Sequence, residues 1–242
     1  MNPTNSKIQL EGKRVYVAGH NGLVGSALMR RLEGEGCDLL TASRVDLDLR
    51  QQASVETWMQ KHRPQIIFMA AAKVGGIQAN IDSPVEFLYD NLMIETNIIH
   101  AAHRAKVEKL VNLGSTCIYP KLAPQPLREE YLLTGALEPT NEGYAIAKIA
   151  GIKLCEAYGR QHDCNFISVL PTNLYGVGDN FDLTTSHVLP ALMRKAHEAK
   201  QAKAKQLVVW GSGTPTREFL HVDDLAEALV FVAKQYHDRL PL

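Results

Sequence analysis

Short apolar runs alternate with longer amphipathic segments along most of this chain of 242 residues. The apolar runs predict strands over residues 14–18, 38–41, 65–70, 109–113, 165–170 and 206–210. Apolar positions at helical spacing predict helices over residues 22–33, 52–62, 84–105, 142–161, 186–200 and 222–234. The strands contain few polar residues, which is typical of a parallel sheet with helices on both faces. The alternation therefore predicts an α/β fold with a doubly wound parallel sheet.

The pattern changes after Pro171. The segment that follows, PTNLYGVGDNFDLTTS, is polar and rich in Gly, Asn and Asp, and we expect only one further strand after it. Boundaries between domains usually fall in segments of this kind. We therefore expect the doubly wound domain to span residues 1–170. A smaller lobe, which looks incomplete, is expected over residues 171–242.

The composition is that of a globular protein. Hydrophobic residues make up 45% of the chain and charged residues 21%, far from the balance of a disordered chain. The 26 Lys and Arg residues equal the 26 Asp and Glu residues, so no overall field favours nucleic acid or an anionic membrane. No apolar segment is long enough for a membrane span or a secretory signal, and the 4 cysteines form no CxxC pair. We therefore expect a cytoplasmic protein that binds neither nucleic acid nor membrane.

Three glycines lie between the first predicted strand and the first predicted helix. Gly19, Gly22 and Gly25 have the spacing GxxGxxG. Glycine permits a tight turn and a close approach to a pyrophosphate, and the start of the helix attracts phosphate. Turn glycines placed by chance would not be expected to follow a strand and precede a helix. The motif therefore predicts a dinucleotide-binding domain of the Rossmann type over residues 1–170.

The residues after the second predicted strand favour one form of the cofactor. A carboxylate there would bind the ribose hydroxyl of NAD, but the chain has the sequence TASR, ending at Arg44. A guanidinium pairs well with the 2′-phosphate of NADP. Arg44 as a solvated loop cation is the alternative, and Asp46 and Asp48 follow closely. We expect NADP(H) rather than NAD(H).

Tyr144 and Lys148 are four residues apart and share one face of a predicted helix. An ammonium beside the phenol would lower its pKa from ~10 toward the working pH, where proton transfer is efficient. Alone, this spacing is more often a core and a surface residue. Ser115 and Cys117 follow the preceding strand, at the sheet edge where such folds bind ligands. A strand-end serine and a buried thiol are the alternative reading of that pair.

Together these residues resemble the extended short-chain dehydrogenase/reductase family. The resemblance covers residues 14–228 and runs through AGHNGLVGSA, AAAKVGGIQAN, LGSTCIYP, EGYAIAKIAG, PTNLYGVGDNFD, SHVLPAL and WGSGTPTREFLHVDDLAEA. AAKVGGIQAN and the Ser-Thr-Cys step are far more specific than the glycine spacing. The similarity is greatest to members that convert GDP-4-keto-6-deoxy-D-mannose to GDP-L-fucose. It implies epimerisation at C3 and C5, followed by reduction of the C4 ketone by NADPH.

The resemblance also implies a role for individual residues. Tyr144 would donate the proton in reduction, Lys148 would hold the ribose and the phenol, and Ser115 would bind the C4 oxygen. Cys117 and His187 would form the acid–base pair for the epimerisations, since a thiol and an imidazole both titrate near neutrality. The implied cofactor contacts are Gly19, Asn21, Gly22, Leu23, Val24, Gly25, Arg44, Asp46, Leu47, Leu113, Gly114, Lys148, Pro171, Asn173, Leu174 and His187. The implied GDP-sugar contacts are Lys195, Trp210 and Arg217.

Family members pair as homodimers through the helices that match residues 84–105 and 142–161, so a homodimer is expected. Taken alone, Trp210 would more often be a core residue, Arg217 a surface cation and His187 a helix-terminal residue. His100 and His103 are three residues apart on a predicted helix, but they have no obvious acidic partners, and the resemblance implies no metal. We therefore expect no metal site.

Other functions remain open. An NAD-dependent nucleotide-sugar 4-epimerase would leave Cys117 and His187 without a purpose, and a dehydratase would carry an Asp-Glu pair beside Ser115. A non-catalytic cofactor sensor would lack Tyr144 or Lys148. Family members continue for several further elements, so we expect only part of the substrate-binding lobe, and a shortened chain that binds cofactor without turnover is a further alternative.

Overall fold

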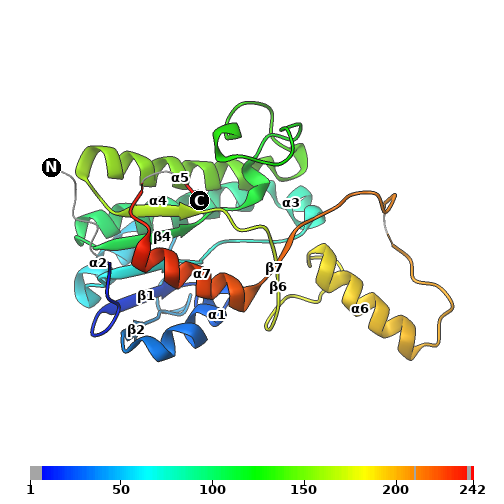
Figure 1. Ribbon diagram of the computed structural model, residues 1–242, viewed down its shortest axis with the longest axis horizontal. Helices are drawn as coiled ribbons and strands as arrows, with labels where there is room; N and C mark the ends of the chain where they lie inside the picture. The colour runs from blue at the N-terminus through cyan, green and yellow to red at the C-terminus, as the bar shows by residue number, and fades with distance from the viewer. Residues whose placement is uncertain (1–6, 210, 239–240) are drawn as a thin grey trace.

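A five-stranded parallel sheet forms the centre of the computed structural model, which describes residues 7–209, 211–238 and 241–242 (Figure 1). The strands are β1 (Arg14–Ala18), β2 (Asp38–Leu40), β3 (Ile66–Met69), β4 (Lys109–Leu113) and β5 (Phe166–Val169). Their order is β2-β1-β3-β4-β5, and every neighbouring pair is parallel. The order reverses between β1 and β3, and ligands of doubly wound folds bind at the carboxyl edge of such a point. The predicted fold class is confirmed.

Helices cover both faces of this sheet (Figure 1). The helices on one face are α1 (Leu23–Leu32) and α7 (Val222–Gln235), and those on the other are α2 (Gln52–His62), α4 (Pro84–Arg104) and α5 (Glu142–His162). Successive strand residues point to opposite faces. Val15 and Val17 of β1 therefore join the core under α1 and α7, whereas Tyr16 and Ala18 join the core under α2, α4 and α5.

Three short elements were not expected from the sequence. They are α3 (Ile77–Asp82), β6 (Asn173–Tyr175) and β7 (Phe219–His221). The two strands form a separate parallel pair, with Asn173 opposite Phe219 and Tyr175 opposite His221. Because each has only three residues, neither shows a periodic pattern in the sequence. Each strand is stabilised by hydrogen bonds to the other, which is distant in the chain. The segment after Pro171 is thus not a loop throughout.

The strand predicted over residues 206–210 is wrong as far as the structure describes it. Residues 206–209 form no strand, and Trp210 lies outside the described residues. Leu207, Val208 and Val209 are exposed. Residues of this apolar and β-branched type favour strands, but among the described residues no second strand lies beside them to form a sheet. Short apolar runs alone do not distinguish a strand from an unpaired extended segment.

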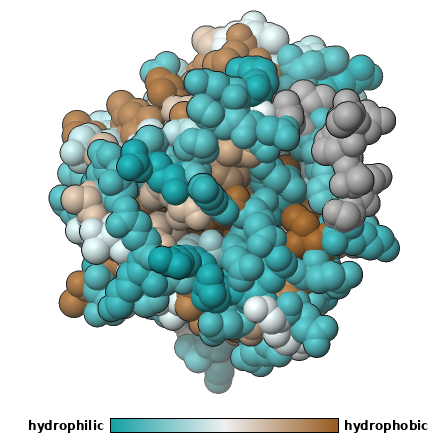
Figure 2. All heavy atoms as spheres, turned by 90° about the vertical axis from the view of Figure 1, so that its left-hand side faces the viewer, coloured by the Kyte–Doolittle hydropathy of each residue, from teal (hydrophilic) through white to brown (hydrophobic). Residues whose placement is uncertain are grey.

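One part of the chain projects away from the central sheet. The helix α6 (Val188–Gln201) and the segment that follows extend away from the carboxyl edge of the sheet before β7 and α7 return to it (Figure 1). The opposite end of the molecule presents mostly hydrophilic residues, with smaller hydrophobic patches between them (Figure 2). Among the described residues, no helix is both long enough and apolar enough to cross a membrane.

Candidate active site

The glycine loop between β1 and α1 is shaped by contacts that exclude larger residues. Gly19 has φ of +84°, and a Cβ there would lie 2.8 Å from the backbone of Ala71. A Cβ on Gly25 would overlap the Gly19 carbonyl oxygen. Gly22 is the N-cap of α1 and has an extended backbone, so the first N–H groups of the helix face outward beside the loop. This geometry can hold a diphosphate at the start of α1.

A cavity of about 400 Å³ opens beside this loop, and we call it the cofactor cavity. Its walls come from the loops after β1, β2 and β3, at the edge where the strand order reverses. The predicted cofactor residues that line it are Gly19, Asn21, Gly22, Arg44 and Leu47. The lining residues not foreseen from the sequence are His20, Ala42, Ser43, Asp48, Leu49, Arg50, Ala70, Ala71, Ala72, Lys73, Asp90 and Ile94. The AAAK motif after β3 was a signal for part of this wall.

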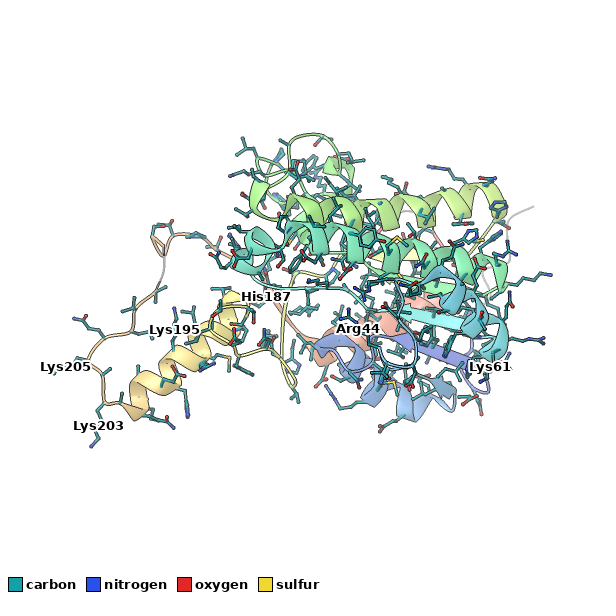
Figure 3. The ribbon with its side chains drawn as sticks, turned by 180° about the vertical axis from the view of Figure 1, so that it is seen from behind. Arg44, Lys61, His187, Lys195, Lys203 and Lys205 are labelled. Carbon is teal, nitrogen blue, oxygen red and sulfur yellow. The ribbon has the colours of Figure 1, made fainter. Side chains whose placement is uncertain are left out.

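The acidic residues near Arg44 form hydrogen bonds with other side chains. Arg50 donates to Asp48 at 2.7 Å and to Asp90 at 3.2 Å, and this bonding lowers the pKa of Asp48 to about 2. The Ser43 hydroxyl lies 2.6 Å from a carboxylate oxygen of Asp46. Arg44 is exposed and has no hydrogen bond or ion pair with any described residue. Its guanidinium is thus available to an anion in the cofactor cavity, on the side of the sheet that faces α6 (Figure 3).

A second group of predicted residues meets where β4 ends and α5 begins. Ser115, Cys117, Tyr144 and Lys148, which we call the Tyr144 cluster, lie close enough that the other three all influence the pKa of the Tyr144 phenol. Ser115 caps the 3-10 turn Thr116–Ile118, where its hydroxyl accepts a hydrogen bond from the Cys117 N–H at 3.3 Å. The Cys117 thiol is free and exposed, so the alternative of a buried structural thiol does not hold.

Lys148 is held by two partners. Its buried ammonium donates to Glu95 of α4 at 2.5 Å and to the Leu113 carbonyl at 2.7 Å. Burial alone would lower the pKa of Lys148, but the Glu95 carboxylate and the Tyr144 phenol together raise it. The surroundings thus favour the charged form of Lys148, which lies between a carboxylate and the end of β4.

The expectation that Lys148 lowers the pKa of the Tyr144 phenol below its ordinary value is wrong for this structure. Burial raises the pKa of the phenol more than the Lys148 ammonium lowers it, and Cys117 and then the Glu95 carboxylate add to the rise. The sequence could not reveal this, because Glu95 lies 53 residues from Lys148 and meets it only when α4 packs on α5. Glu95 is therefore a residue of this site that no sequence motif indicates.

A second cavity, of about 300 Å³, lies beside the Tyr144 ring. The first turns of α4 and α5 and the helix α3 contribute its walls, which include Phe87 and Gly143. The buried side-chain oxygens of Asn80 and Asn141 border this cavity and have no hydrogen-bond partner among the described residues. It offers space and unused acceptors next to the phenol.

The remaining predicted site residues do not line the cofactor cavity. They are Leu23, Val24, Gly25, Asp46, Leu113, Gly114, Lys148, Pro171, Asn173, Leu174 and His187. Some of them form hydrogen bonds within the protein. The Leu113 carbonyl accepts a hydrogen bond from the Lys148 ammonium, and the Asn173 amide donates to the Glu218 carbonyl at 3.1 Å. Roles for these residues toward a cofactor stay predictions.

Of the residues predicted to contact the sugar, those that the structure describes do not line the cavity beside the Tyr144 ring. His187 is the exposed N-cap of α6, at the end of that helix nearest the sheet, while Lys195 lies further along it (Figure 3). Arg217 is exposed and donates to the neighbouring Thr216 carbonyl at 2.7 Å, and Trp210 lies outside the described residues. The roles of all four stay predictions.

The two histidines considered for a metal have protein partners. His100 Nδ1 lies 2.6 Å from the Tyr158 hydroxyl, and His103 Nδ1 lies 3.3 Å from the Cys164 sulfur. In the described part of the chain, no group of three or more His, Cys, Asp or Glu side chains is arranged to hold a metal ion.

Residues 15–241 match the model of the NAD dependent epimerase/dehydratase family. The chain belongs to this family. Within the epimerase/dehydratase family it is 59% identical, over 229 residues, to a GDP-L-fucose synthase of Sinorhizobium fredii (strain NBRC 101917 / NGR234), with 95% of this chain and 73% of that protein covered. It is 56% identical to the GDP-L-fucose synthase of Escherichia coli (strain K12), with 93% and 71% covered. These matches confirm the resemblance to extended short-chain dehydrogenases/reductases.

A solved structure from the same family has the same fold. It is a GDP-L-fucose synthetase from Naegleria fowleri bound to NADP, 33% identical in sequence, with a TM-score of 0.89. The match covers 99% of this chain and 79% of that one. The doubly wound sheet and its helical layers are thus common to both epimerase/dehydratase family members.

Proposed function

We propose that this chain is an NADPH-dependent epimerase-reductase that converts GDP-4-keto-6-deoxy-D-mannose to GDP-L-fucose. The observation that carries the proposal is the exposed Cys117 thiol beside the Ser115 and Tyr144 hydroxyls. A simple ketone reductase or 4-epimerase needs the two hydroxyls but has no use for a thiol at that position. Relatives that are 56–59% identical and carry the name GDP-L-fucose synthase support the same reaction.

The cofactor cavity fits a nicotinamide dinucleotide phosphate. The glycine loop leaves room for a diphosphate, and Arg44 offers an unpaired cation for a 2′-phosphate, while Asp48 is held by Arg50. We assign the nicotinamide ribose to Lys148, whose ammonium donates to the Leu113 carbonyl at the carboxyl end of β4. When bound, NADPH supplies the hydride for C4.

Epimerisation at C3 and C5 follows from the acidity of carbons that flank a ketone. Removing a proton from either carbon gives an enolate, whose oxygen the Ser115 and Tyr144 hydroxyls stabilise by hydrogen bonding. Inversion requires one group to take the proton from one face and another to return it to the opposite face. We assign one of these tasks to Cys117 and the other to His187, since a thiol and an imidazole can each take up and give back a proton.

Reduction at C4 needs a proton on the ketone oxygen as the hydride arrives at carbon. Tyr144 donates this proton from its hydroxyl, and Ser115 holds the oxygen in line. A phenol of ordinary pKa, about 10, is protonated near neutral pH, as a proton donor must be, and burial raises the pKa of Tyr144 further. We assign the binding of the sugar to the cavity beside the Tyr144 ring.

The decisive experiment combines two readouts on the purified chain. With GDP-4-keto-6-deoxy-D-mannose in D₂O, we expect NADPH to be oxidised and deuterium to enter C3 and C5 of the product. GDP-mannose, which has no ketone, should give neither. Oxidation without deuterium would make the chain a simple 4-reductase, and UDP-sugar epimerisation with bound NAD would make it a 4-epimerase. Cofactor binding without turnover would reduce it to a binding chain.

The same helices that carry the cluster are proposed to form a homodimer. The exposed apolar side chains Val85 and Tyr89 on α4 and Ile146 on α5 offer a surface of the kind that subunits bury. Light scattering should give about twice the chain mass of 26.8 kDa. A mass that stays at that of one chain would contradict the dimer.

A further inference from the structure

His187 lies at the start of a helix that extends away from the sheet, so its position depends on what holds the segment before it. His187 is the exposed N-cap of α6 (Figure 3). Two residues earlier, the Thr185 carbonyl accepts a hydrogen bond from the Gly76 N–H at 3.0 Å. Among the residues that the structure describes, no other backbone hydrogen bond joins the segment 176–186 to the rest of the chain. This contact therefore ties the start of α6 to the loop after β3.

The segment before α6 packs directly on the backbone of Gly76. A Cβ at this position would lie 2.7 Å from the Ser186 carbonyl oxygen, which is closer than side chains approach in proteins. Gly76 has a φ of −64°, which any residue adopts, so the position needs glycine for space rather than for its backbone conformation. A larger residue at position 76 therefore has to displace Ser186 and, with it, the start of α6.

Asn80 of α3 fixes the loop on which this segment docks. Its amide group donates to the carbonyls of Gly75 and Gly76, each at 3.0 Å, and the residue is only 7% exposed. Gly75 is itself confined, because a Cβ there would lie 3.1 Å from the Phe87 ring. Asn80 also lines the cavity beside the Tyr144 ring. One buried side chain thus connects the wall of that cavity to the docking point of α6.

Hydrogen bonds within the docked segment carry the position of Thr185 on to His187. The Asp182 carboxylate accepts from the Thr185 N–H at 2.9 Å and from its hydroxyl at 3.0 Å. The Asn180 amide donates to the same hydroxyl at 2.9 Å, and the Ser186 N–H donates to the Asp182 carbonyl at 2.9 Å. A turn held by side chains in this way has little freedom to absorb a shift. Moving Thr185 is therefore expected to move His187.

We propose that Gly76 and Asn80 are positioning residues for His187, because they fix the loop where the segment before α6 docks and so place the imidazole for proton transfer. The proposal rests on the acid–base role of His187 under the proposed function. Neither Gly76 nor Asn80 is assigned a proton or hydride transfer of its own. Since a misplacement of about 1 Å can lower a rate by about 10²-fold, disturbing the docking point should slow epimerisation.

The test measures deuterium entry at C3 and C5 of GDP-4-keto-6-deoxy-D-mannose in D₂O, with NADP⁺ in place of NADPH so that no hydride is available. The unaltered chain is compared with Gly76→Ala, His187→Gln and the double variant. We expect Gly76→Ala to slow the exchange about tenfold or more. In the His187→Gln background it should cause no further loss, because both changes act on the same step. An equal loss in both backgrounds, or an unchanged rate in folded Gly76→Ala protein, overturns the proposal.

Matched variants separate this effect from a general disturbance of the fold. Gly34→Ala makes the same change at an exposed glycine where a Cβ meets nothing within 4 Å, and it should leave the exchange unchanged. Asn80→Ala removes both donors to the loop and should slow the exchange only while His187 is present. If His187→Gln leaves no measurable exchange, the NMR signals of the His187 ring decide. They should shift in Gly76→Ala but not in Gly34→Ala, and unshifted signals overturn the proposal.

The unaltered protein provides a test that does not depend on whether the variants fold. The Gly76 N–H should be protected from hydrogen exchange with solvent, because it is bonded to the Thr185 carbonyl. If neither Gly76→Ala nor Asn80→Ala is folded by circular dichroism, this protection decides, and rapid exchange of the Gly76 amide overturns the proposal.

The two proposals fail in different ways. A chain that takes up no deuterium refutes the proposed function, and uptake at the full rate in His187→Gln refutes the role that function gives to His187. The Gly76 amide still reports in both cases whether the segment docks there. Deuterium uptake that depends on His187 but not on Gly76 refutes the positioning role alone.

Discussion

Replacing Arg44 with alanine is expected to separate the affinities for NADPH and NADH. Arg44 lines the cofactor cavity, is exposed, and has no hydrogen bond or ion pair with any described residue. The nearby Asp48 carboxylate is hydrogen-bonded to Arg50 at 2.7 Å, and it interacts with Arg44 through space alone. The 2′-phosphate is the group that distinguishes NADPH from NADH, and a guanidinium is its natural partner.

The size of the effect follows from the exposure of Arg44. A hydrogen bond between charged groups contributes about 1.5–3 kcal/mol. Solvent and salt screen an exposed pair, which places Arg44 near the lower end of that range. Because about 1.4 kcal/mol corresponds to a tenfold change in Kd, we expect Arg44→Ala to weaken NADPH binding about tenfold. NADH binding should stay within about twofold, since the lost contact is absent there.

The assay is a fluorescence titration of both cofactors against the unaltered protein and the variant, at low and high salt. The difference between the two proteins should shrink as salt rises. Lys61→Ala is the matched control, because Lys61 is an exposed cation of α2 at the far end of the molecule from α6 (Figure 3). An equal loss for both cofactors, or no loss for NADPH, would make Arg44 a solvated loop cation and refute the reasoning.

Three further substitutions test the other parts of the site. Cys117→Ser should abolish deuterium exchange at C3 and C5, because a hydroxyl is far less acidic than a thiol, while the Kd for NADPH measured by fluorescence stays unchanged; persisting exchange would remove Cys117 from the epimerisation. Tyr144→Phe should lower NADPH oxidation by about 10²–10⁴-fold, since a phenyl ring has no proton to give, and full turnover would contradict its role as donor. Gly25→Ala forces a methyl group onto the Gly19 carbonyl, so binding of both NADPH and NADH should fall together in calorimetry. Binding unaffected by Gly25→Ala would mean that the loop does not hold the diphosphate.

Much of the fold and part of the site could be predicted from the sequence, because the signals are local. The bounds predicted for β1, β4 and α2 match the structure, since each is a continuous apolar or amphipathic segment. The strands β6 and β7 have only three residues each, too few to show a period in the sequence. The apolar residues 206–209 have the composition of a strand but no partner strand in the described part of the chain, and strand pairing is not visible in a sequence. Tyr144 and Lys148 could be found by their spacing on one helix.

The amino-acid sequence alone establishes which chemical groups are available: a glycine loop between strand and helix, a cation after the second strand, and a hydroxyl, a thiol, a phenol and an ammonium at fixed places in the chain. The electrostatic surroundings of these groups depend on the fold. The Glu95 carboxylate reaches Lys148 because α4 packs on α5 and Gly151 leaves the space. Burial and charge depend on distances between segments far apart in sequence, so the raised pKa of Tyr144 belongs to the packed helices and to no motif.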